Sequence, residues 1–74
     1  MRIVNDFGLV RIVSMGDPFT QAHDVRVEWQ KDGAWTLYRG FNSLSDDYVW
    51  DNSREAAGRA IRELAAELAA EAAV

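Results

Sequence analysis

The sequence predicts an α+β fold: a three-stranded antiparallel sheet, or a four-stranded one, followed by one long C-terminal helix that packs on one face of the sheet (β-β-β-α). Three observations predict it. The first half of the chain holds segments rich in β-branched and aromatic residues. Turn-forming residues separate these segments. The last third consists of strong helix formers, above all alanine.

The 74 residues are expected to form one small domain, residues 1–74, with an apolar fraction of 49% that is ordinary for a globular protein. The chain has no cysteine, so no disulfide and no thiolate metal site is available. No segment has the pattern of a signal peptide or the length of a membrane span. We therefore expect a cytoplasmic protein that has no membrane association and that gains stability from a partner chain if its core needs one.

Two strands are predicted near the N-terminus. The main one covers about residues 9–15, and a short one at residues 2–4 precedes it, with turn-forming residues 5–8 between them. Apolar side chains fall on both faces of residues 9–15. This strand is therefore either central or has one face in contact with something outside the domain. Gly16-Asp17-Pro18 is expected to end it.

A β-hairpin is predicted at residues 24–30 and 34–41, because Val25, Val27 and Trp29 alternate with polar residues. The apolar face selects the register. A three-residue loop pairs Trp29 with Trp35 and Val27 with Leu37, whereas a two-residue loop leaves the last strand's apolar residues on the polar face. We therefore predict a type I turn and a G1 bulge with the glycine of the loop in the left-handed conformation.

The helix is predicted from residue 53 to about residue 73, with Asn52 as N-cap and Glu55 completing a capping box. Residues 42–47 are expected to be a loop, and Tyr48-Val49-Trp50 either a short strand or a lead-in to the helix. An apolar stripe follows the spacing of one helix face, and it consists of Ala57, Ile61, Leu64, Leu68 and Ala72.

The expected core combines this stripe with the hairpin, and its members are Val27, Trp29, Trp35, Leu37, Ile61, Leu64 and Leu68. One helix covers one face of a sheet only. Tyr38, Phe41 and one face of residues 9–15 are then left uncovered. An exposed apolar patch of this kind is typical of an interaction surface.

The sequence gives no support for catalysis. His23 and Asp24 have the chemistry of an acid–base pair or of half a metal site, but no motif positions a nucleophile near them. A surface histidine beside the start of a strand is the simpler interpretation. We therefore expect no enzymatic activity, no cofactor and no metal.

Asp46, Asp47 and Asp51 form an acidic cluster interleaved with Tyr48 and Trp50. Their spacing does not match that of an EF-hand, which disfavours a calcium site. The cluster suits a solvated segment that leads into a helix N-terminus, where the helix dipole favours negative charge. Aromatic residues flanked by carboxylates are also typical of an interface with a basic protein.

Glu63, Glu67 and Glu71 recur once per helical turn and form one row, with about 6 Å between successive carboxylates. This spacing is similar to that of successive phosphates on a nucleic-acid strand. The row is either an ordinary solvated helix face or a phosphate-mimicking surface that occupies a basic groove of a target.

Arg26, Lys31 and Arg39 lie in the predicted hairpin, where a basic sheet face would suit single-stranded nucleic acid. Glu28 shares the face of Arg26, and the formal net charge of the chain is -4. A negative charge disfavours non-specific binding to nucleic acid. We therefore expect these basic residues to form local ion pairs.

A short acidic chain without catalytic residues, with a β-β-β-α layout and a glutamate row, resembles the small phage-encoded anti-CRISPR proteins. That group has no common motif, so the resemblance covers size, charge and layout. It implies a stoichiometric inhibitor, a DNA mimic in the host cytoplasm, that blocks access of nucleic acid to a CRISPR effector subunit. The contact residues that it implies are Asp46, Asp47, Glu63, Glu67 and Glu71.

The leading hypothesis is therefore a non-enzymatic inhibitor that binds a basic protein surface. Its expected partner-binding residues are Tyr38, Asp46, Asp47, Tyr48, Trp50, Glu63, Glu67 and Glu71. The alternatives are a small nucleic-acid-binding or regulatory protein, and a structural module that dimerises through its uncovered sheet face.

Overall fold

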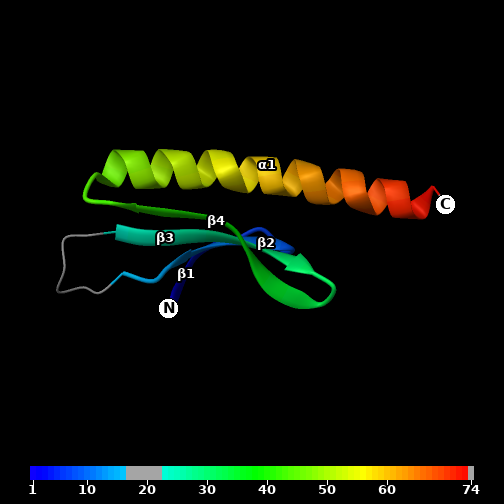
Figure 1. The fold of residues 1–74 in the computed structure, drawn as a ribbon, viewed down its shortest axis with the longest axis horizontal. Helices are drawn as coiled ribbons and strands as arrows, with labels where there is room; N and C mark the ends of the chain where they lie inside the picture. Colours follow the sequence, from blue (N-terminus) through cyan, green and yellow to red (C-terminus); the bar gives the residue numbers. More distant parts are fainter. Residues whose placement is uncertain (17–22, 74) are drawn as a thin grey trace.

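The structure, a computed structural model, describes residues 1–16 and 23–73. The described residues form β1 (Arg2–Asp6), β2 (Val10–Ser14), β3 (His23–Lys31), β4 (Ala34–Ser43) and α1 (Asp46–Ala72). The four strands form one antiparallel sheet in chain order, and α1 lies along one face of it (Figure 1). The predicted α+β fold is confirmed with four strands. The predicted strand end at residues 17–18 lies outside the described residues.

A tight turn connects β1 to β2. The backbone N–H of Phe7 donates to the carbonyl of Val10, and the side chain of Asp6 accepts a hydrogen bond of 2.9 Å from the N–H of Gly8. Gly8 has a φ of 90°, a conformation that glycine adopts without steric cost. Because Asp6 lies within β1, this strand extends further than the predicted residues 2–4.

The turn between β3 and β4 differs from the prediction. Lys31 pairs with Ala34, so the loop has two residues, Asp32 and Gly33, with φ of 53° and 80°. The left-handed conformation of Gly33 is confirmed, but the three-residue loop is wrong. Positive φ at both loop positions is the signature of a type I′ turn, which Asp-Gly favours because its twist matches that of the strands.

A bulge in the middle of β4 corrects the register downstream of this turn. Glu28 lies opposite Leu37 and Val27 lies opposite Arg39, so Tyr38 is the extra residue. Tyr38 and Phe41 both pack against the core on the helix side of the sheet, Phe41 because the bulge places it opposite Val25, contrary to our expectation that they would lie uncovered.

Trp35 and Leu37 lie on the other face of the sheet, in contrast to the predicted pairing with Trp29 and Val27. Trp35 is opposite Gln30, and the guanidinium of Arg11 stacks over its ring at 4.1 Å from the ring centre. The prediction assumed that a tryptophan must be buried by apolar neighbours. Here a cation covers it instead.

The helix begins earlier than predicted. Ser45 is the N-cap, and its hydroxyl accepts a hydrogen bond from the backbone N–H of Tyr48. Residues 48–50 are therefore helical, and the predicted short strand or lead-in is wrong. Asn52 is not a cap, since its side chain donates to the carbonyl of Tyr48 within the helix. Asp46 and Asp47 in the first turn stabilise the earlier start through the helix dipole.

The core lies between α1 and the sheet, and it is built from small residues on the helix and β-branched residues on the strands. Its fully buried members are Val10, Ile12, Val25, Val27, Val49, Ser53, Ala56, Ala57 and Ala60, with Leu64 almost fully buried beside them. Small side chains on the helix let its backbone approach the sheet closely, so the valine layer fills the space between them.

Several residues of the predicted core lie elsewhere. Val27 and Leu64 are buried and Trp29 is partly buried against the core, as expected. By contrast, the exposed fractions of Leu37, Ile61 and Leu68 are 57%, 40% and 48%. The helix presents its small residues to the sheet, and this rotation turns the large side chains of the predicted stripe toward its flank.

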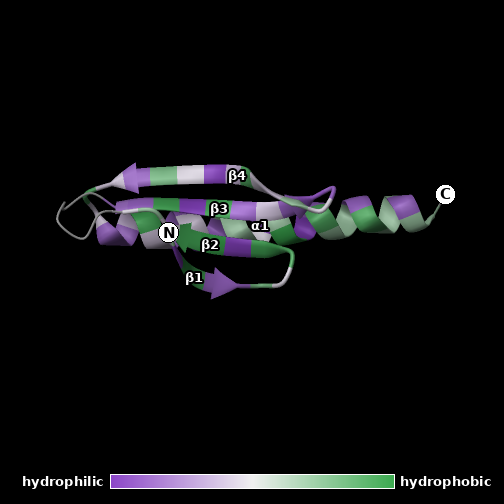
Figure 2. Ribbon diagram, turned by 90° about the horizontal axis from the view of Figure 1, so that it is seen from below, coloured by the Kyte–Doolittle hydropathy of each residue, from purple (hydrophilic) through white to green (hydrophobic). Residues whose placement is uncertain are grey.

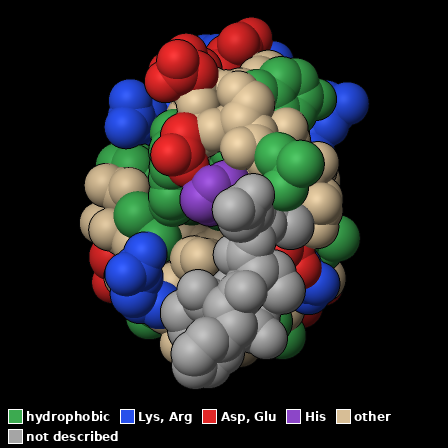
Figure 3. All heavy atoms as spheres, turned by 90° about the vertical axis from the view of Figure 1, so that its left-hand side faces the viewer, with side chains coloured by type: hydrophobic (Ala, Val, Ile, Leu, Met, Phe, Trp, Pro, Cys, Tyr) green, Lys and Arg blue, Asp and Glu red, His purple; other side chains and the backbone are tan. Residues whose placement is uncertain are grey.

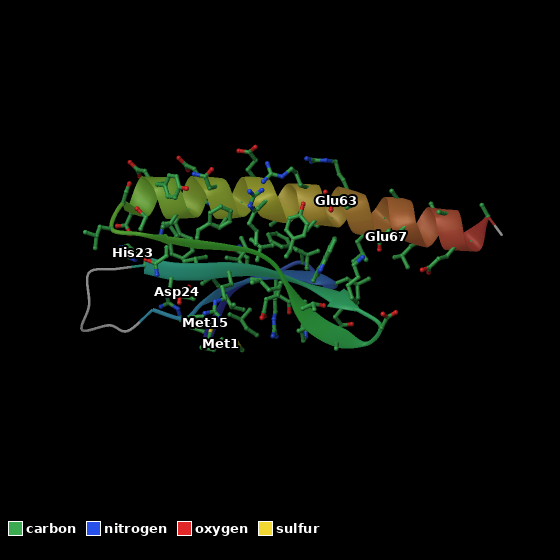
Figure 4. The ribbon with its side chains drawn as sticks, in the orientation of Figure 1. Met1, Met15, His23, Asp24, Glu63 and Glu67 are labelled. Atoms are coloured by element: carbon green, nitrogen blue, oxygen red, sulfur yellow. The ribbon has the colours of Figure 1, made fainter. Side chains whose placement is uncertain are left out.

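The second face of the sheet is not covered by any described element. Met1 and Met15 lie on this face, away from α1 (Figure 4). Polar and apolar residues alternate along its strands (Figure 2). β2 lies between β1 and β3, so the expected alternative of a central strand is confirmed for residues 9–15, and its second face carries Arg11, Val13 and Met15. Val13 is nevertheless fully buried between its neighbours on β1 and β3.

Candidate protein-binding surfaces

Two carboxylates of the predicted glutamate row are held by the β3–β4 hairpin. Glu63 accepts a hydrogen bond of 3.0 Å from the hydroxyl of Tyr38, and Glu67 accepts one of 2.6 Å from the ammonium of Lys31. Both glutamates lie on the C-terminal half of α1 (Figure 4). The row is therefore partly engaged within the protein, and Glu71 is its one member without an ion-pair or hydrogen-bond partner among the described residues.

The partners of this row form one connected cluster. The ammonium of Lys31 lies 4.1 Å from the centre of the Trp29 ring, so it contacts an aromatic face as well as Glu67. The rings of Trp29 and Tyr38 are 4.6 Å apart between centroids and tilted by 59°. Tyr38, predicted as a partner-binding residue, instead joins the hairpin to the helix. This arrangement favours a structural role for Tyr38, Glu63 and Glu67.

The first turns of α1, with Leu44 just before them, carry a different surface, which we call the acidic end and which consists of Leu44, Asp46, Asp47, Tyr48 and Asp51. All five residues are exposed, Leu44 at 72% and Tyr48 at 52%. Acidic side chains gather over the helix when the molecule is viewed from this end (Figure 3). An exposed aromatic ring among carboxylates can contact the apolar stem and the charged head of an arginine or lysine at once.

Trp50 is not part of the acidic end. Its side chain is half-buried and packs against the core, because the early start of α1 places it on the helix face next to the sheet. The sequence cluster of acidic and aromatic residues therefore divides in the structure. Tyr48 faces solvent and Trp50 faces inward.

His23 contacts Asp46 and not its sequence neighbour Asp24. Its Nε2 lies 2.8 Å from a carboxylate oxygen of Asp46, which ties the start of β3 to the start of α1. Asp24 instead approaches the guanidinium of Arg26, at 3.5 Å. His23 and Asp24 lie together at the start of β3 (Figure 4). No group of three or more possible metal ligands is present within the described residues.

The basic residues of the sheet are mostly paired. Arg26 contacts Asp24, Lys31 contacts Glu67, and Arg11 forms an ion pair of 2.8 Å with Glu28. The expected local ion pairs are thus confirmed for Arg26 and Lys31, whereas Arg39 is exposed and forms no ion pair among the described residues. Because Arg11, Arg26 and Lys31 are each paired with a carboxylate, they do not form a continuous basic face of the kind that binds single-stranded nucleic acid.

An apolar groove lies between the β1–β2 turn and α1, with a volume of about 210 Å³. Its lining consists of Phe7, Leu9, Val10, Ile61, Leu64, Ala65 and Leu68. Sequence reasoning missed it, because it treated Phe7 as a turn residue and placed the leucines and the isoleucine of the helix in the core. The large apolar residues Phe7 and Leu9 on either side of the turn residue Gly8 could have indicated an apolar surface at this turn.

The chain matches no protein-family model, and no curated protein or solved structure shows significant similarity to it. α1, the one described helix, has no stretch that is long and apolar enough to cross a membrane.

Proposed function

We propose that this chain is a non-enzymatic inhibitor that binds a basic surface of a target protein through its acidic end. The observation that carries the proposal is the exposure of Tyr48 between Asp47 and Asp51, at the end of the molecule where the helix dipole is positive. Among the described residues, the side chain of Tyr48 takes part in no hydrogen bond, and only its backbone does. Tyrosine is among the residues that most often dominate the energetics of protein interfaces.

The carboxylates of the acidic end would replace the phosphates of nucleic acid on the target. A surface that binds nucleic acid is basic, so a competitor needs negative charge held in a fixed position. Asp46 is held by His23, and Asp47 and Asp51 are one helical turn apart on a rigid element. The resemblance to anti-CRISPR proteins suggests the class of target, which is a CRISPR effector subunit whose nucleic-acid channel the chain would block.

The glutamate row has a smaller part in this proposal than the sequence predicts. Lys31 neutralises the charge of Glu67, and Glu63 is hydrogen-bonded to Tyr38. Removing either contact to free a carboxylate costs stability. Glu71 is exposed, but it lies at the opposite end of α1 from Asp47, so the two are unsuited to a single compact contact.

The first experiment is capture of the tagged chain with its partners from nuclease-treated bacterial lysate, read by mass spectrometry. The proposal expects one nucleic-acid-handling protein or complex in stoichiometric amount. Recovery of nucleic acid alone, when nuclease is omitted, would instead support the alternative of a direct nucleic-acid binder. The pairing of Arg11, Arg26 and Lys31 with carboxylates speaks against that outcome.

A matched pair of charge reversals tests the surface itself. Asp51→Lys and Glu71→Lys make the same change of charge at exposed positions of the same helix. Binding to the captured target is expected to weaken about tenfold for Asp51→Lys, and further with added salt, because rim charges act through screened electrostatics. Equal effects of both variants would show that net charge, and not the acidic end, governs binding.

A further inference from the structure

The C-terminal part of α1 extends beyond the sheet and carries an exposed apolar seam. The helix continues past the β3–β4 hairpin (Figure 1), and the contact between Lys31 and Glu67 marks the end of the sheet beneath it. Ile61 and Ala65, before this point, and Leu68 and Ala72, after it, lie on one flank of α1, and all four are exposed. We call these four residues the seam.

The seam borders the apolar groove. Ile61, Ala65 and Leu68 line the groove from the helix side, and the exposed side chains of Phe7 and Leu9 form its opposite wall. Every residue that lines the groove is apolar. A monomer of 8.3 kDa gains nothing from leaving such a surface in water, and exposed apolar surfaces of this kind mark interaction sites.

We propose that a second copy of this chain covers the groove, by antiparallel pairing of the two α1 helices along the seam. The spacings between seam residues are four, three and four, which is the repeat of a two-helix seam. The seam alternates in size, with large residues at 61 and 68 and alanine at 65 and 72.

This alternation makes the seam complementary to itself in one orientation. A two-fold axis that passes between residues 66 and 67 places Leu68 opposite Ala65 of the partner subunit, and Ile61 opposite Ala72 of the partner subunit. Each large side chain then meets a small one. Parallel pairing would oppose large residues to large ones and leave gaps between the alanines.

The same register fills the groove. Ala65 lines the groove between Ile61 and Leu68, so the leucine that lies opposite Ala65 points into it. Two-fold symmetry makes Leu68 of each subunit enter the groove of the other. Glu63 and Glu67 do not oppose the contact, since Tyr38 and Lys31 hold them on the hairpin side of the helix. This complementarity favours a second copy over an unrelated helix.

Sedimentation velocity or light scattering over a concentration series tests the proposal. The expected mass is that of a dimer, twice the 8.3 kDa of one chain. Leu68→Glu is expected to give a monomer. Leu37→Glu, which places the same change on the exposed second face of the sheet, is expected to remain dimeric. If Leu37→Glu disrupts the dimer and Leu68→Glu leaves it intact, the interface lies on the sheet and the proposal is wrong.

Ala65→Trp separates the effect on assembly from any effect on folding. Its indole would fill the groove from within the same chain and exclude the partner's leucine. This variant is expected to be monomeric with an unchanged circular dichroism spectrum. A wild-type chain that stays monomeric at all concentrations up to several hundred micromolar would also overturn the proposal, whether or not it binds another protein.

Cysteine pairing tests the orientation, and the chain has no cysteine of its own to interfere. Ala65→Cys and Leu68→Cys chains are mixed under mild oxidation. The antiparallel register predicts that disulfides join the two variants to each other faster than they join Ala65→Cys chains to themselves. Preferential self-pairing of Ala65→Cys would indicate parallel helices and contradict the proposed dimer.

Discussion

The hydroxyl of Tyr38 donates a hydrogen bond of 3.0 Å to Glu63, and so connects the bulged residue of β4 to the C-terminal half of α1. The two-residue turn sets this contact, since its register would place Tyr38 opposite Val27, on the helix side of the sheet, even without the bulge. The extra residue acts further along β4, because without it Phe41 would lie opposite Asp24, on the face away from the helix.

Removing this contact is expected to destabilise the fold modestly. Tyr38→Phe deletes the donor and keeps the ring against Trp29, so the free energy of unfolding should fall by about 0.5–1 kcal/mol. Urea denaturation of Tyr38→Phe, Glu63→Ala and the double variant measures the coupling. If the two single effects simply add, the hydrogen bond contributes nothing to stability.

The type I′ turn predicts a cost at Gly33 that is conformational in origin. Its φ is 80°, and a Cβ built there meets no atom within 4 Å, so strain and not collision opposes a side chain. Gly33→Val should lower the free energy of unfolding by about 1–2 kcal/mol, because a β-branched residue resists the left-handed region.

Gly40→Ala is the control for this prediction. A Cβ at Gly40 also meets no atom within 4 Å, but its φ lies outside the left-handed region. Thermal melts should therefore show no loss of stability for Gly40→Ala. Similar losses for both variants would mean that strand propensity, and not the turn, determines the cost.

The close approach of α1 to the sheet predicts that larger side chains are not tolerated at its small buried positions. Ala60 is fully buried, whereas Ala66 is exposed to solvent. Ala60→Leu should reduce the free energy of unfolding by about 1–3 kcal/mol through overpacking. Ala66→Leu, the same substitution, should be nearly neutral. Chemical denaturation of both variants checks the difference.

The ion pair between Arg11 and Glu28 is expected to matter more than a surface pair. Its side chains are only 15% and 19% exposed, and Arg11 also covers the ring of Trp35. Arg11→Ala leaves a partly buried carboxylate without its partner, so we expect a loss of about 1–3 kcal/mol.

The pair between Arg59 and Glu55 provides the comparison, since its side chains are 37% and 67% exposed. Arg59→Ala should cost no more than about 0.5 kcal/mol. Replacing Arg11 and Glu28 together by Met and Leu should recover most of the stability lost in Arg11→Ala. Failure of the double variant to recover would indicate that stacking on Trp35 contributes more than the charge pairing.

The elements of the fold could be predicted because local patterns determine them. Alternation at Val25, Val27 and Trp29 identifies β3, and continuous helix propensity identifies α1. The start of the helix was less certain, because Ser45 and Asn52 are both good N-caps and propensity alone does not rank them. The acidic residues Asp46 and Asp47 directly after Ser45 favour Ser45 as the N-cap, because negative charge in the first turn stabilises the helix.

Packing could not be predicted to the same extent. The search for a core stripe favoured large residues, so it selected Ile61 and Leu68 and overlooked the buried face of Ser53, Ala56 and Ala60. The glutamate row follows from spacing alone. Its contacts with Tyr38 and Lys31 depend on the two-residue turn, which the predicted pairing of large apolar residues had excluded.

Because α1 extends beyond the sheet, its two ends are expected to unfold at different stability. Amide protons near Val49 and Ala60, over the sheet, should exchange with solvent only when the whole domain unfolds. Those past Leu68 depend on a helix end without tertiary support, and they should exchange orders of magnitude faster in the isolated chain. On heating, helical dichroism should therefore decline before tryptophan fluorescence does, so the two melting curves would not coincide.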